Sequence, residues 1–128
     1  MRGVLDTSVF IAADQQRRLL AERLPDEAAV SVVTLAELEL GVHPACSEEV
    51  RARRLRTLGA IRATYAALPI DEAVASAFAE LVAAARRDGR RPKVQDAWIA
   101  ATARAHEVAV YSQDADFDGL PGIDVVRV

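Results

Sequence analysis

Short apolar runs alternate along this chain with longer segments in which apolar residues recur at helical spacing. This alternation is typical of a parallel sheet whose strands are connected by helices that cover its faces. Strands are predicted over residues 3–5, 29–32, 66–70, 108–111 and 124–128, and helices over residues 8–13, 15–24, 34–41, 47–64, 71–88 and 95–106. The pattern therefore predicts an α/β fold.

Residues with strong helix-terminal preferences support several of these boundaries. Asp71 is a favourable N-cap, and Gly41 and Gly89 suit helix C-termini because glycine tolerates a positive φ. Thr34 and Glu37 have the spacing of a capping box, in which the glutamate returns to the backbone amide of the threonine. This spacing predicts that Glu37 caps this helix, a structural role that has to be weighed against any functional role.

Length and composition limit the classes of protein to which the chain can belong. Its 128 residues are predicted to form one domain (1–128), and a hydrophobic content of 52% suffices for a buried core. Cys46 is the only cysteine, which excludes an intramolecular disulfide and, with only two histidines, a zinc cluster. Neither a signal peptide nor a membrane span is recognisable, so a cytoplasmic location is expected.

Two acidic residues follow predicted strands. Asp6 comes directly after the strand at residues 3–5, and Asp114 lies shortly after the strand at residues 108–111. In open α/β sheets the functional crevice lies beyond the carboxyl ends of the strands, where the strand order reverses. Both carboxyl groups are therefore expected at one rim, although a single aspartate in such a place is more often a cap.

Two further acids lie near the starts of helices that begin at that rim. Glu37 is one turn into the helix after the second strand, whereas Glu39 is expected to point into solvent. Asp96 heads a helical face whose other members, at i+3, i+4 and i+7 spacing, are apolar: Ile99, Ala100 and Ala103. The helix dipole explains why an acid is tolerated there, but it does not explain the alignment.

Four acids at one rim point to a bound cation. Converging carboxylates raise one another's pKa values unless a cation relieves their repulsion. Oxygen ligands without histidine or cysteine favour Mg²⁺ or Mn²⁺ over Zn²⁺. Such ions activate water and stabilise a leaving alkoxide, so the acids predict metal-assisted phosphoryl chemistry without naming its substrate.

Four sequence motifs, in order along the chain, carry a resemblance to a known family. They are residues 5–8 (LDTS), 31–38 (SVVTLAEL) with Gly41, 96–103 (DAWIAATA) and 111–117 (YSQDADF). The chain resembles the PIN-domain family, specifically the VapC-type toxins of bacterial toxin–antitoxin pairs. The resemblance implies a three-layer α/β/α sandwich with a central, mostly parallel sheet of four or five strands.

The resemblance also implies an activity and the residues that perform it. The activity is metal-dependent cleavage of RNA, with Mg²⁺ or Mn²⁺ held by the acids at matching positions: Asp6, Glu37, Asp96 and Asp114, with Asp116 as a further ligand. Supporting hydrogen bonds are expected from Thr7, Ser8 and Ser112. The expected partners are RNA, a cognate VapB-like antitoxin and a second copy of the chain as a homodimer.

The net charge of −3 at first opposes RNA binding. Setting aside the five site acids leaves 14 acidic against 16 basic residues, so the rest of the chain carries about two positive charges. The basic residues considered for phosphate contacts are Arg17 and Arg18, the group from Arg51 to Arg56, and the segment from Arg86 to Lys93. From these, Arg51, Arg54, Arg90, Arg91 and Lys93 are chosen as the expected RNA-binding residues. An arginine-rich helical face is more often simply solvated, and these assignments remain expectations.

Two other classes of protein are compatible with parts of the pattern. Haloacid-dehalogenase-type phosphatases also place an aspartate after the first strand, but they need a second acid where this chain has Ser8, and receiver domains need early paired acids. Both are disfavoured. A catalytically silent PIN-like module that binds RNA or protein is the remaining alternative, against which the intact set of acids argues.

Overall fold

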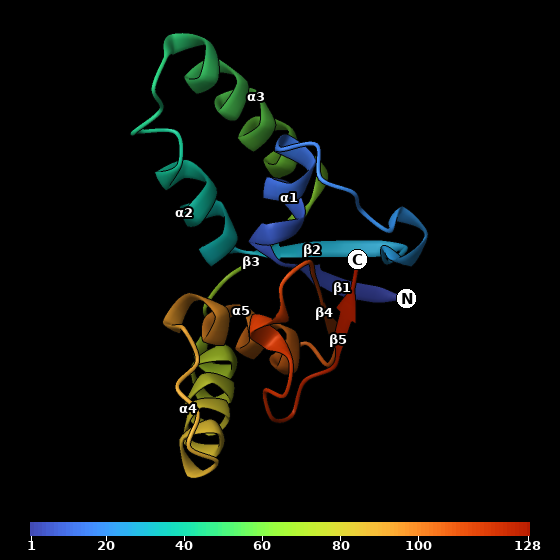
Figure 1. Ribbon diagram of the computed structural model, residues 1–128. Helices are drawn as coiled ribbons and strands as arrows, with labels where there is room; N and C mark the ends of the chain where they lie inside the picture. Colours follow the sequence, from blue (N-terminus) through green and yellow to red (C-terminus); the bar gives the residue numbers. More distant parts are fainter.

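The five predicted strands form one sheet in the computed structural model, which describes all 128 residues (Figure 1). They are β1 (Arg2–Leu5), β2 (Glu27–Ser31), β3 (Ala66–Leu68), β4 (Ala109–Ser112) and β5 (Val125–Arg127). The strand order is β3-β2-β1-β4-β5, and every pairing is parallel. The strand order therefore reverses at β1, in the centre of the sheet.

Helices cover both faces of this sheet. They are α1 (Thr7–Asp14), α2 (Val32–Leu40), α3 (Glu48–Thr64), α4 (Glu72–Arg87) and α5 (Val94–Ala105), with two 3₁₀ turns, η1 (Ala21–Arg23) and η2 (Ala115–Phe117). Figure 1 shows α4 and α5 on one side of the sheet and α1 and α3 on the other. The three-layer α/β/α sandwich is confirmed. None of the helices combines the length and apolar character needed to cross a membrane.

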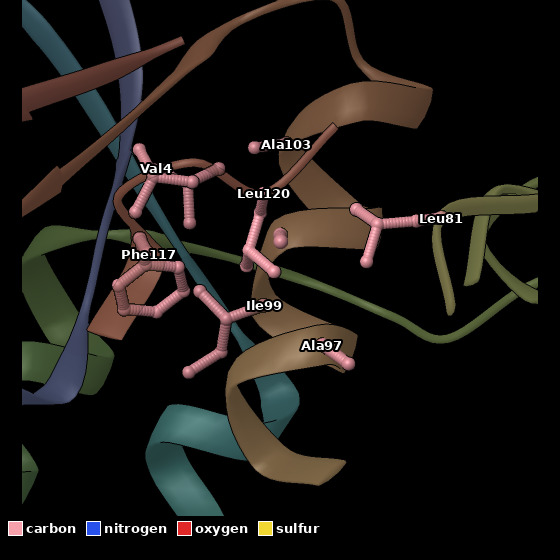
Figure 2. Packing of buried hydrophobic residues seen from close by; sticks show 9 residues of the cluster. Val4, Leu81, Ala97, Ile99, Ala103, Phe117 and Leu120 are labelled. Carbon is pink, nitrogen blue, oxygen red and sulfur yellow. The ribbon is translucent and has the colours of Figure 1, made fainter. Parts of the chain in front are cut away.

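Two apolar layers hold the helices to the sheet, because successive side chains of a strand point to opposite faces. Val4 of β1 belongs to the layer under α5, where Figure 2 shows it with Ile99 and Phe117. Its neighbour Leu5 belongs to the layer under α1 and α3, together with Tyr111 of β4. Asp6 is the residue directly after β1, so it lies at the carboxyl edge of the sheet.

The helix predicted over residues 15–24 is wrong. α1 ends at Asp14, and Gln16 adopts a left-handed φ of 56°. The amide of Arg17 donates to the carbonyl of Ala12 at 2.8 Å, and the amide of Gln16 donates to Ala13 at 3.3 Å. These are the bonds of a Schellman motif, which normally uses glycine at the left-handed position. The chain then continues without regular structure to η1.

The capping box predicted from Thr34 and Glu37 is also wrong. α2 begins two residues earlier than predicted, and its N-cap is Ser31, whose hydroxyl accepts from the amide of Val33 at 3.0 Å. Thr34 is therefore inside the helix and fully buried. Gly41 closes the helix with a φ of −68°, so no positive φ is needed there.

The predicted ends of α4 are confirmed. The carboxyl group of Asp71 accepts from the amide of Val74 at 2.9 Å, and Gly89 has a φ of +75° directly after the helix. The basic segment that follows α4 leads into α5, whose first turn contains Asp96. Because β4 follows α5 and runs parallel to β1, the N-terminus of α5 lies at the carboxyl edge of the sheet.

Candidate metal centre

The five predicted acids line a single cavity of about 340 Å³ at the carboxyl edge of the sheet. Asp6 follows β1, Asp114 and Asp116 follow β4, Glu37 projects from α2, and Asp96 projects from α5. The complete lining is Asp6, Thr7, Ser8, Ile11, Arg17, Glu37, Lys93, Gln95, Asp96, Asp114 and Asp116. Strand order explains this convergence, because the neighbours of β1 place their carboxyl ends on either side of Asp6.

Asp6 is buried and held by hydroxyl and amide donors. Ser112 Oγ donates to Asp6 Oδ2 at 3.0 Å, and the amide of Ser8 donates to the same oxygen at 3.3 Å, which also makes Asp6 the N-cap of α1. A hydroxyl has one hydrogen, so Ser8 Oγ is the donor in its 3.2 Å contact with Ser112 Oγ. Burial raises the pKa of Asp6, and these hydrogen bonds oppose the rise.

Glu37 has a hydroxyl partner of its own. Thr7 Oγ1 lies 2.8 Å from Glu37 Oε1 and 3.0 Å from Thr34 Oγ1. Only one of these contacts can use the single hydroxyl hydrogen of Thr7, and a carboxylate is the stronger acceptor. Burial and the charge of Asp6 raise the pKa of Glu37, while the bond from Thr7 lowers it. The carboxyl group thus turns toward Thr7 rather than toward the start of its own helix.

Asp96 differs from both of these acids. Its Oδ2 atom is buried and has no hydrogen-bond partner, the one such side-chain atom in the chain. Burial, followed by the charges of Asp6 and Asp116, raises the pKa of Asp96 to about 6, and Lys93 acts in the opposite direction. A buried carboxylate oxygen without a partner carries a free-energy cost that a nearby cation would relieve.

Asp114 and Asp116 lie on the loop after β4. Asp114 precedes η2 but makes no side-chain capping bond, so the cap interpretation does not apply to it. Asp116 Oδ2 accepts from Lys93 Nζ at 3.1 Å, and this bond raises the pKa of the lysine. The amide of Asp114 donates to Ser112 Oγ at 2.9 Å, which joins this loop to the hydroxyl network around Asp6.

The donor set suits a hard divalent cation. All five acids present oxygen atoms, and no histidine or cysteine lines the cavity. Asp96 has a buried oxygen without a partner, and burial, followed by the negative charges of Asp6, Asp116 and Glu37, raises its pKa. In their present rotamers no three acids converge on one point closely enough to hold an ion. Binding would therefore draw some of these side chains closer together.

The basic residues considered for phosphate contacts lie in different parts of the structure. Arg17 and Lys93 line the acid cavity, and Arg18 does not. Arg51 pairs with Glu48 in the first turn of α3, Arg54 donates to the carbonyl of Gly41 at 2.7 Å, and Arg90 donates to the carbonyl of Asp118 at 2.7 Å. Arg91 lines a separate hollow between α4 and α5, so these four arginines do not meet the acids.

Sequence reasoning did not single out the apolar residue Ile11, which lines the cavity, or two polar residues at the site. Gln95 lines the cavity beside Asp96, and Thr34 supports Thr7 from inside α2. The side-chain period of a helix could have indicated Thr34, because it lies three residues before Glu37 and shares its face. No comparable signal distinguishes Gln95.

Comparison with known proteins places this fold and cavity in one class. The PIN domain family model matches residues 3–123 of the sequence. The chain therefore belongs to the PIN-domain family, and the resemblance carried by the four motifs is confirmed.

Particular members of the family are similar over nearly the whole chain. Ribonuclease VapC5 of Mycobacterium tuberculosis is 43% identical, over 98% of this chain and 95% of its own length. Ribonuclease VapC4 of the same organism is 42% identical, over 99% and 97% respectively. The crystal structure of VapBC-5 from Mycobacterium tuberculosis, a member of the VapBC family of toxin–antitoxin systems, matches with a TM-score of 0.88 and 42% identity, over 99% of this chain and 98% of that chain.

Proposed function

We propose that this chain is a metal-dependent endoribonuclease that acts as the toxin of a VapBC toxin–antitoxin pair. The observation that carries the proposal is the convergence of five acids on one cavity at the centre of the sheet's carboxyl edge. RNA as the substrate is supported by the names of two relatives that match nearly the whole chain, Ribonuclease VapC5 and Ribonuclease VapC4.

The residues that would hold Mg²⁺ or Mn²⁺ are Asp6, Glu37, Asp96 and Asp114, with Asp116 at the margin of the cavity. A divalent cation bound there supplies the positive charge that activates a water molecule and stabilises the charge developing on the phosphodiester. Asp6 enters this role with its orientation already set by Ser112 and Ser8. Asp96 has to lose its proton to bind a cation, and its raised pKa makes that step dependent on pH near 6.

The proposed partner is a VapB-like antitoxin. The similar VapBC-5 structure is described as a member of the VapBC family of toxin–antitoxin systems, which supports this class of partner for a chain that matches it over 99% of its length. Homodimer formation, expected from the family resemblance, stays a prediction.

The proposal is tested with purified chain, free of antitoxin, and total cellular RNA. We expect cleavage with Mg²⁺ or Mn²⁺, none with a chelator, and a loss of at least about a hundredfold in Asp6→Asn and in Glu37→Gln, because each removes a ligand charge. Glu39→Gln is the matched control for Glu37→Gln, since Glu39 is exposed on the same helix and pairs with Arg62 at 3.3 Å.

Two results would contradict the proposal. The first is undigested RNA with both metals while the protein is folded and monodisperse, which would favour a catalytically silent RNA- or protein-binding module. The second is unchanged cleavage by Asp6→Asn, which would place the reaction outside this cavity.

A further inference from the structure

We propose that Arg17 binds a backbone phosphate of the substrate at the mouth of the acid cavity. This inference rests on the proposed function, because it assigns a substrate contact to the same site. It concerns a residue outside the set of acids, and it assigns the contact to Arg17 rather than to its neighbour Arg18, the other basic residue that the sequence offers in this segment.

The first observation is that Arg17 is a cation without an intramolecular partner. Two basic residues line the cavity, and the other, Lys93, is paired with Asp116 at 3.1 Å. The side chain of Arg17 makes no hydrogen bond or ion pair and is exposed, although it borders a cavity with five acids. An arginine whose role was to neutralise those acids would be expected to pair with one of them.

The second observation is that the backbone at Arg17 is fixed. Its amide donates to Ala12 at 2.8 Å across the left-handed turn at Gln16. The next carbonyl, that of Arg18, accepts from Gln113 Nε2 at 2.9 Å. The left-handed conformation of a residue other than glycine persists only where its surroundings hold it. Here the helix end and Gln113 hold it from two sides.

The same glutamine connects this segment to the acids. The amide of Gln113 donates to Ser8 Oγ at 3.0 Å, and Ser8 belongs to the hydroxyl network that orients Asp6. The position of Arg17 relative to Asp6 is thus set by one continuous chain of hydrogen bonds. Because the backbone that carries the Arg17 guanidinium is already fixed, less backbone freedom is lost when the side chain binds an anion.

The charges around the cavity favour a phosphodiester as the ligand of Arg17. Acids that hold a divalent cation no longer repel a phosphodiester, and a neighbouring guanidinium adds two parallel donors that match phosphate oxygens. Lys93 is already engaged with Asp116, so Arg17 is the lining cation available for this contact. An acidic segment of a protein partner could use the same guanidinium, and the experiment below separates the two.

The test measures cleavage of a short fluorogenic single-stranded RNA by wild type, Arg17→Ala, Arg17→Lys and Arg18→Ala over a range of NaCl concentrations. We expect Arg17→Ala to lower kcat/KM about tenfold at low salt and to flatten the slope of log kcat/KM against log salt by about 0.7, the value for one phosphate contact on a single strand. Arg17→Lys should keep the slope and recover part of the rate. Arg18 is the matched control, because it is also exposed on the same segment but does not line the cavity.

A slope for Arg17→Ala equal to that of wild type would overturn the inference, as would an equal loss in Arg18→Ala. A variant that cleaves RNA normally but no longer forms a complex with the antitoxin would assign Arg17 to the protein partner instead. If wild type does not cleave RNA at all, the proposed function fails.

The Arg17 contact can be tested separately by measuring the affinity of labelled RNA for two proteins, the Asp96→Asn variant and the double variant Asp96→Asn, Arg17→Ala. Equal affinities of these two proteins for RNA would refute the Arg17 contact.

Discussion

The acid cavity has two halves that are built differently. The anchored half consists of Asp6 and Glu37, each of which accepts a hydrogen bond from a hydroxyl group within 3.0 Å. The unanchored half consists of Asp96, which has a buried oxygen without a partner, and Asp116, which accepts a hydrogen bond from the long, flexible and exposed side chain of Lys93. Acidic side chains thus lie in two different environments within one cavity.

The difference indicates which parts of the site are ordered by folding and which parts would be ordered by ion binding. Hydrogen bonds to the anchored half form on folding and stabilise the ionised carboxylates whether or not a cation is bound. In the unanchored half, the buried oxygen of Asp96 has no such donor, and a bound metal ion would supply the interaction that it lacks. We therefore expect substitutions in the anchored half to change both stability and activity, and those in the unanchored half to change the response to metal and pH.

Among substitutions of residues that surround the acids or tune their pKa values, the largest effect is expected from Ser112→Ala, which removes the hydroxyl donor of Asp6. The substitution removes the donor to Asp6 Oδ2 and the acceptor of the Asp114 amide, and Ser112 is fully buried. We expect a loss of about 1–3 kcal/mol in the free energy of unfolding and of about 10–100-fold in RNA cleavage. Urea denaturation and initial cleavage rates measure the two quantities.

Ser76→Ala is the control for that substitution, because Ser76 is exposed on α4 and far from the cavity in sequence and fold. It should change stability by less than about 0.5 kcal/mol. A Ser112→Ala protein with wild-type stability and activity would show that the hydroxyl network does not hold Asp6.

A smaller effect of opposite sign is expected from Asp96→Asn in the unanchored half. The raised pKa means that ionisation of Asp96 destabilises the metal-free protein; this penalty is absent below the ordinary pKa of 3.8 and complete above about 6. At pH 7 without metal, Asp96→Asn should therefore be more stable than wild type by about 1 kcal/mol, after allowance for solvent screening. The advantage should disappear as the pH falls from about 6 to 4.

Thermal unfolding with and without Mg²⁺ measures this prediction. Wild type should gain stability from the ion, and Asp96→Asn should gain much less. Asp118→Asn serves as the comparison, because Asp118 is an exposed acid on the same loop as Asp116, paired with Arg127 and outside the cavity lining. An Asp96→Asn protein that is less stable than wild type at pH 7 without metal would contradict the assignment of the unanchored half.

The smallest effect is expected from Lys93→Met, which sharpens the distinction between the halves. Lys93 lowers the pKa of Asp96, so its removal should move the acid limb of the pH–rate profile to higher pH. Lys93→Arg retains the charge and should leave the limb in place. If Lys93→Met and Lys93→Arg give the same profile, the lysine charge does not act on Asp96.

Much of the fold and the meeting of the acids could be predicted from sequence. Parallel strands with intervening helices bring their carboxyl ends to one edge, so acids that directly follow β1 and β4 had to be neighbours once the strands were recognised. Asp96 was predictable for a different reason, since Ile99 and Ala100 orient its helix and are fully buried. Family membership then connected this arrangement to RNA.

Other features depend on contacts between distant residues and were not predictable. Thr34 and Glu37 satisfy a local capping rule, but Thr7, 30 residues before Glu37, provides the donor that its carboxyl group uses. Gln16 has no glycine or asparagine signal for its left-handed φ, and the leucines at 19, 20 and 24 prolong an apolar pattern without a helix. Nothing in the sequence ranked Arg17 above the other basic residues.

The hydrogen bond from Ser112 to Asp6 joins residues 106 positions apart in the chain. During synthesis, the central strand β1 is translated well before its neighbour β4. The carboxylate of Asp6 therefore lacks the donor from Ser112 until β4 has been made. The site that we propose cuts RNA should accordingly assemble only after β4 has left the ribosome.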